Sequence, residues 1–82
     1  MYTQTKLVLQ QLTKANMWLD TADLIAIRDV KERCVAQATE AEDRVRSWLR
    51  DRCPVVDAVE VGEALEELSD RLAMQSVDEE RH

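Results

Sequence analysis

With 82 residues, a formal net charge of −6 and only two cysteines, the chain excludes several classes of protein. It is too short for two domains, and two cysteines with one histidine cannot supply a four-ligand zinc site or a multi-disulfide scaffold. A single glycine and a single proline, against many Ala, Leu, Glu, Arg and Gln, predict an all-α fold. The sequence shows neither a signal-peptide pattern nor an apolar run that could span a bilayer, so we expect a cytoplasmic protein.

The first predicted helix covers about residues 3–17. Its apolar stripe has helical spacing and consists of Val8, Leu12, Ala15 and Leu19, with Leu9 beside it. Capping chemistry predicts where it ends, because Asp20 can cap a new helix and Leu19 and Leu24 have the spacing of a hydrophobic staple. Trp18 is interpreted as a packing anchor at this junction, although tryptophan is also common at interface centres.

The second predicted helix, residues 21–52, is the longest. Its apolar stripe is expected to form the core or a dimer interface and consists of Leu24, Ile27, Val30, Cys34, Ala38, Ala41, Val45 and Trp48. The small residues at the centre of this stripe would let another helix approach closely. Pro54 ends the helix, since proline disfavours helix at the residue before it. In one alternative, Thr39 and Glu42 cap a new helix, but neighbouring alanines favour continuity.

A second capping pattern begins the third predicted helix, residues 58–75. Asp57 is the predicted cap, Glu60 stands three positions later, and Val56 and Val61 have the spacing of a staple. The apolar stripe of this helix consists of Val61, Leu65, Leu68 and Leu72.

The three helices are therefore expected to be short, long and short. At about 1.5 Å per residue, the central helix would be about 48 Å long and its neighbours about 22 and 27 Å. Neither neighbour could cover the central helix alone, so each half would expose an apolar side. We therefore predict a homodimer that completes a helical bundle. Residues 1–76 would form one domain, and residues 77–82 a charged flexible tail.

Charge is distributed unevenly along the chain. Residues 1–52 carry nine Lys or Arg against eight Asp or Glu, whereas residues 53–82 carry two Arg against nine acids. Five of these acids form an acidic ridge opposite the apolar stripe of the third helix: Glu60, Glu63, Glu66, Glu67 and Asp70. Three interpretations are open: a solvated face, a surface that pairs with arginines of the second helix, or a docking surface for a basic partner protein.

A basic segment precedes the end of the second helix and contains Arg44, Arg46, Trp48, Arg50 and Arg52. Arginines around an aromatic residue suggest contact with nucleic acid, but a net charge of −6 argues against it. Trp48 also belongs to the predicted apolar stripe, and arginines in a last helical turn complement the helix dipole. Nucleic-acid binding is therefore the least favoured interpretation.

We find no pattern typical of catalysis. The single histidine, His82, lies in the predicted tail, and there is neither a glycine-rich phosphate loop nor a paired metal-ligand motif. We therefore expect no enzymatic activity, cofactor or metal. Cys34 is expected in the core and Cys53 nearer the surface, about 28 Å apart along a continuous helix, which excludes a disulfide within one chain.

Together these features predict a small acidic helical protein that acts by binding another protein, as inhibitors, antiactivators, adaptors and chaperones do. The expected partner has a basic surface, and no membrane is involved. A structural subunit that uses its apolar stripe for self-association is the alternative. A nucleic-acid-binding regulator that uses Arg44–Arg52 comes third.

Overall fold

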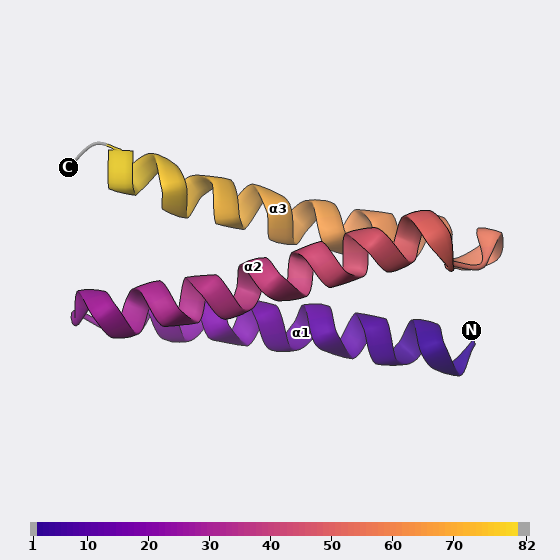
Figure 1. Ribbon diagram of the computed structural model, residues 1–82, viewed down its shortest axis with the longest axis horizontal. Coiled ribbons are helices and arrows are strands. Elements are labelled where there is room, and N and C mark those ends of the chain that lie inside the picture. The colour runs from indigo at the N-terminus through magenta and orange to yellow at the C-terminus, as the bar shows by residue number, and fades with distance from the viewer. Residues whose placement is uncertain (1, 81–82) are drawn as a thin grey trace.

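The computed structural model describes the backbone of residues 2–80 and the side chains of residues 2–75. Its elements are α1 (Thr3–Leu24), α2 (Arg28–Asp51), the short 3-10 helix η1 (Val55–Asp57) and α3 (Ala58–Glu80). The all-α class with three helices is therefore confirmed. The helices lie side by side, with α1 and α3 running in one direction and α2 in the other (Figure 1).

The predicted short, long and short pattern is wrong. The three helices contain 22, 24 and 23 residues, so each is about 33–36 Å long at the usual rise. They form an elongated bundle of 42 × 20 × 15 Å. Helix α1 extends along most of α2, whereas α3 packs near α2 at its own start and separates from it toward its C-terminal end (Figure 1). The central helix is therefore not overlong, and its length does not require a second copy to cover it.

Asp20 was predicted to cap the second helix, but this prediction is wrong, because Asp20 lies within α1. The apolar stripe of α1 continues past it, and Leu19 and Ala22 are both fully buried. A cap contributes about 1 kcal/mol, whereas burying one leucine side chain contributes about 1.5–3 kcal/mol. Continuing the helix is therefore favoured over a cap at Asp20. The predicted staple is also absent, because Leu24 is 88% exposed.

The chain reverses at residues 25–27 without using a glycine. Ile25 and Ile27 both have extended backbone angles, with φ/ψ of −98°/129° and −78°/115°. Ile25 and Ile27 are β-branched and would lose side-chain freedom in a helix. Leaving this segment extended therefore costs little free energy. Asp29 follows in the first turn of α2, where its charge is favourable near the exposed amides.

Helix α2 is continuous through Thr39, so the alternative of a break there is wrong. The Thr39 hydroxyl donates to the Val35 carbonyl at 2.9 Å, one turn back along the same helix. The small residues Cys34, Ala38 and Ala41 are buried, as the stripe predicts. Their size permits close packing against α1, whose own stripe includes two alanines.

Helix α3 begins at Ala58, as predicted, but Asp57 does not act as expected. The Asp57 carboxylate is buried and accepts a hydrogen bond of 2.7 Å from the hydroxyl of Thr5 in α1. The staple prediction is wrong here too, because Val56 is 80% exposed. The helix extends to Glu80, beyond its predicted end at residue 75. Residues 77–80 of the predicted tail belong to this helix and residues 81–82 lie outside the described residues, so the flexibility of the tail stays a prediction.

All three helices contribute to one hydrophobic core. Its members are Val8, Leu12, Ala15 and Leu19 from α1, Ala38, Ala41 and Val45 from α2, and Val61, Leu65, Leu68 and Leu72 from α3. The stripes predicted for the first and third helices are therefore confirmed residue by residue. Trp48 and Leu49 pack at the edge of this core and are half-buried.

A second connection between α1 and α3 lies nearer the surface, around Arg71. Its guanidinium donates to the backbone and side-chain oxygens of Asn16, both at 3.1 Å, and pairs with Asp20 and Asp23. Gln75 donates to Asp23 at 2.8 Å. Asp20, the predicted helix cap, therefore joins α1 to α3 together with Asp23.

Candidate functional site

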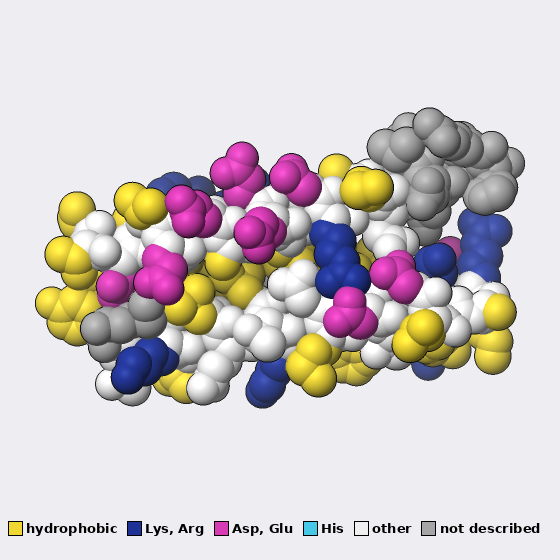
Figure 2. Space-filling view, turned by 180° about the vertical axis from the view of Figure 1, so that it is seen from behind, with side chains coloured by type: hydrophobic (Ala, Val, Ile, Leu, Met, Phe, Trp, Pro, Cys, Tyr) yellow, Lys and Arg dark blue, Asp and Glu magenta, His cyan; other side chains and the backbone are white. Residues whose placement is uncertain are grey.

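The acidic ridge on α3 is the first candidate surface. Its five members, Glu60, Glu63, Glu66, Glu67 and Asp70, are all exposed. They point outward because the buried residues Val61, Leu65 and Leu68 direct the opposite side of the helix into the core. Figure 2 shows acidic side chains gathered on the half of the molecule where α3 begins. The four ridge residues from Glu63 to Asp70 line a shallow depression of about 230 Å³.

The ridge is not neutralised by the arginines of α2. Among the described side chains, no ion pair joins a ridge carboxylate to an arginine. Arg46 instead lies 3.5 Å from Glu42 on its own helix and donates to Ser69 at 2.8 Å. Among the described side chains, the interpretation that pairs the ridge with arginines of the second helix therefore has no support. Like charges three or four residues apart repel by a few tenths of a kcal/mol per pair, so the ridge carries a small uncompensated cost.

An apolar tip lies beside the ridge, at the end of the bundle where α3 begins. Val55, Val56 and Val59 are 89%, 80% and 72% exposed. Figure 2 shows hydrophobic side chains at this end, next to the acidic group. Three valines left in water within five residues are not required by the core, since Val61 supplies the first buried position of α3. The tip and the ridge together make one surface that is apolar at the end of the bundle and acidic along α3.

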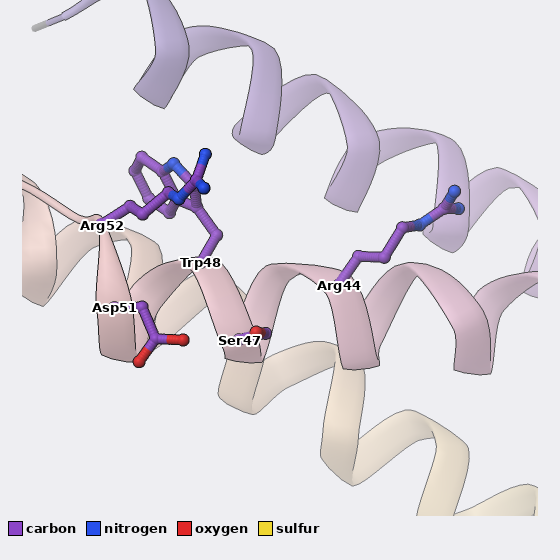
Figure 3. A pocket seen from close by; sticks show the side chains of 5 residues that line it. All are labelled: Arg44, Ser47, Trp48, Asp51 and Arg52. Carbon is purple, nitrogen blue, oxygen red and sulfur yellow. The ribbon is translucent and has the colours of Figure 1, made fainter.

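The basic segment is divided between faces of α2. Arg44, Trp48 and Arg52 stand four residues apart and line a depression of about 320 Å³ with Ser47 and Asp51. In Figure 3, the Arg52 side chain extends toward the Trp48 indole, and Arg44 lies on the same side of the helix. Successive residues of an α-helix are rotated by about 100°. Arg46 and Arg50, each two positions from Trp48, therefore point to nearly the opposite side of α2.

Arg46 and Arg50 do not line that depression, although Arg50 binds Asp51, which does. Arg46 faces α3 through Ser69, and Arg50 donates to Asp51 at 3.1 Å. The hydrogen bond and charge of Asp51 raise the pKa of the Arg50 guanidinium. The four arginines predicted as one basic contact therefore do not form a single surface.

The predicted stripe of the second helix is only partly buried. Cys34, Ala38, Ala41 and Val45 are buried and Trp48 is half-buried. The other three residues are exposed: Leu24 by 88%, Ile27 by 65% and Val30 by 37%. Leu24 belongs to α1, and Ile27 is the residue before α2. The stripe therefore contributes to the core through its later half, while its early half surrounds the turn between α1 and α2.

Helix α1 has an exposed apolar surface that its sequence pattern did not reveal. Met17 and Trp18, with Lys14 and Thr21, line a depression of about 300 Å³. Met17 is 61% and Trp18 is 44% exposed, so Trp18 is more than an internal packing anchor. Leu7 is also 52% exposed. Counting apolar residues that fall off the core stripe would have identified this surface.

Both cysteines are free thiols, with Cys34 buried and Cys53 half-buried. Desolvation, with a smaller contribution from the charge of Asp57, raises the pKa of the Cys53 thiol. Within residues 2–75, no three His, Cys, Asp or Glu side chains are grouped as ligands of a metal ion would be. No helix in the described part of the chain is both long and apolar enough to cross a membrane.

Comparisons with protein families, with curated proteins and with solved structures find no match to this chain.

Proposed function

We propose that this protein is a helical interaction module that binds a partner protein through the acidic ridge of α3. The observation that carries the proposal is a row of five exposed carboxylates, none of which is paired with an arginine among the described side chains. Inhibitors, antiactivators, adaptors and chaperones of this size act by occupying another protein's surface. The expected partner has a basic surface, since opposite charge steers association and excludes wrong partners.

The apolar tip adds exposed hydrophobic side chains to the same binding surface. Electrostatic complementarity contributes mainly to on-rate and specificity, whereas well-packed apolar contacts slow dissociation. Val55, Val56 and Val59 provide such contacts next to Glu60. We therefore expect a partner whose apolar residues contact the valines and whose Lys or Arg residues contact the carboxylates.

The test is affinity capture from the native host with the wild-type chain and two matched double variants. Glu63→Lys with Glu67→Lys reverses two ridge charges. Glu40→Lys with Asp43→Lys makes the same charge change at exposed positions of α2. We expect one protein to be captured by the wild type and the α2 variant but lost with the ridge variant, while circular dichroism shows all three folded.

The captured protein must then bind as a purified protein. We expect it to have a basic surface, and its affinity to fall as salt concentration rises, because exposed charges are screened. Equal loss in both double variants would point to net charge alone and contradict a ridge-specific site.

Self-association, as a homodimer or a structural subunit, is the second candidate. The mismatch in helix length no longer supports it, but the exposed apolar surface of α1 does. Contiguous exposed apolar patches on small proteins commonly mark interaction sites. This candidate does not compete with the first, because α1 and the ridge of α3 are separate surfaces.

A nucleic-acid-binding role has the weakest support. Only Arg44 and Arg52 flank Trp48, and the chain remains acidic overall with a net charge of −6. Binding to DNA that weakens steeply with salt and is lost in Arg44→Ala with Arg52→Ala would favour this role. A cytoplasmic location and the lack of enzymatic activity also stay predictions.

A further inference from the structure

The two halves of α3 are held to the rest of the bundle in different ways. In the first half, Val61, Leu65 and Leu68 are buried, and this half lies beside α2 (Figure 1). Toward its C-terminal end, α3 separates from α2 (Figure 1). Over residues 70–75, which we call the end segment, Leu72 is the only buried residue. The end segment therefore has less apolar contact to keep it folded than the half before it.

Ser69 marks the boundary between the two halves. Its hydroxyl donates to the Glu42 carboxylate at 2.6 Å and accepts a hydrogen bond of 2.8 Å from Arg46, and both of these residues belong to α2. The hydrogen bonds and ion pairs that side chains of the end segment make all go to α1 instead. The end segment can therefore leave the bundle without breaking the contact of Ser69 with α2.

Arg71 supplies most of the polar contacts between the end segment and α1. Its guanidinium donates to both oxygens of Asn16 at 3.1 Å and pairs with Asp20 and, at 3.3 Å, with Asp23. All three charged side chains reach water, since Arg71 is 30%, Asp20 66% and Asp23 51% exposed. Exposed ion pairs of this kind contribute little to stability and are screened by salt. The end segment is therefore held by one leucine and by contacts for which ions compete.

From these observations, we propose that the end segment opens independently of the rest of the fold and that Arg71 controls this opening. In the open state the end segment unwinds and leaves α1, while the half before it stays packed. Opening frees Asp20 and Asp23 and brings Leu72 into water. A cation that competes with Arg71 for these two carboxylates favours the open state, since it binds that state better. Four of the five ridge carboxylates lie before the end segment, so this proposal does not depend on the ridge.

Backbone hydrogen exchange, resolved by residue with NMR, measures such an opening. We expect the amides of the end segment to exchange faster than those of Leu65 and Leu68. Their exchange should also depend little on added urea, because a local opening exposes little surface. The amides of Leu65 and Leu68 should instead follow unfolding of the whole chain. Equal protection and equal urea dependence along α3 would overturn the proposal.

Two variants separate local opening from unfolding of the whole chain. Arg71→Met removes contacts that the open state lacks, so exchange in the end segment should speed up about tenfold, which corresponds to about 1.4 kcal/mol. Thr5→Val weakens a contact that the open state keeps. It should therefore speed exchange at Leu65 and leave the end segment unchanged. An end segment that responds to Thr5→Val as strongly as Leu65 does would overturn the proposal, and so would one that does not respond to Arg71→Met.

A salt series tests the ionic part of the contact. Raising NaCl from about 0.05 M to about 0.5 M should speed exchange in the wild-type end segment about threefold, because salt screens exposed ion pairs. Asp20→Asn with Asp23→Asn removes both charges that face Arg71, so this response should vanish. Glu40→Gln with Asp43→Asn removes the same charge from exposed positions of α2 and should keep the response. A response that persists without Asp20 and Asp23, or that both double variants lose, would overturn the control by Arg71.

Discussion

Two connections join α1 to α3 and to the short helix η1 before it, one near each end of the bundle, and they differ in burial. Near the start of α3, the Thr5 hydroxyl donates to the Asp57 carboxylate in a bond that is almost fully enclosed. Near the other end, Arg71 contacts Asn16, Asp20 and Asp23 with its side chain 30% exposed. Water can replace the second set of contacts but not the first. The buried connection should therefore affect stability more, although it contains fewer bonds.

Removing the Thr5 hydroxyl should have the largest effect. Thr5→Val keeps the shape of the side chain but leaves the Asp57 carboxylate buried without this partner. We expect the free energy of unfolding to fall by about 2–3 kcal/mol, as for a lost hydrogen bond to a charged group. Urea denaturation followed by circular dichroism measures it. Thr5→Ser, which keeps the hydroxyl, should recover most of the loss, and equal loss in both variants would contradict this explanation.

Removing the Arg71 guanidinium should have a smaller effect. Arg71→Met keeps much of the aliphatic length and should lower the free energy of unfolding by about 1–2 kcal/mol. The hydrogen bond to Asp20 is the main cause of the raised pKa of the Arg71 guanidinium. The loss should shrink in high salt, whereas the loss in Thr5→Val should not. Equal salt sensitivity would show that both connections are open to solvent.

Reversing ridge charges should change stability least. Glu63→Lys with Glu67→Lys removes like-charge repulsion on a fully exposed face, and we expect a change within about 0.5 kcal/mol. The same variant is expected to lose partner binding, so stability and function separate at this surface. Strong destabilisation would mean that the carboxylates support the fold, and would weaken the proposed docking role.

Cys53 offers a chemical probe of the buried connection. Desolvation and the nearby Asp57 raise its pKa. Less thiolate is therefore present at neutral pH, and alkylation should be slower than for a fully solvent-exposed cysteine. Thr5→Val should speed the reaction if the Asp57 region loosens, while Arg71→Met should not. Mass spectrometry of iodoacetamide-treated protein distinguishes Cys53 from the buried Cys34. Equal rates in both variants would indicate that the two ends open together.

The helical content and two of the three core stripes could be predicted because they depend on local periodicity. Leu12 and Leu68 lie on stripes with steps of three and four, and both are buried. Helix boundaries could not be predicted in the same way. Asp20 and Asp57 both stand where caps commonly stand, yet Arg71 and Thr5, about 50 residues away, bind their carboxylates instead. A capping signal is worth about 1 kcal/mol, which tertiary contacts can exceed.

The candidate surfaces also differ in whether local periodicity or tertiary contacts determine them. The ridge was predictable, since Glu63 and Glu67 lie opposite the leucine stripe of their own helix and needed no other element to place them. The exposed Leu7, Met17 and Trp18 of α1 fall off the core stripe of their helix, but only the packing of α2 and α3 showed that they remain in water. By itself the sequence determined three amphipathic helices and one acidic face. Only the tertiary structure decided where the chain turns, which acids bind arginine and which apolar residues remain in water, since these depend on contacts between residues far apart in the chain.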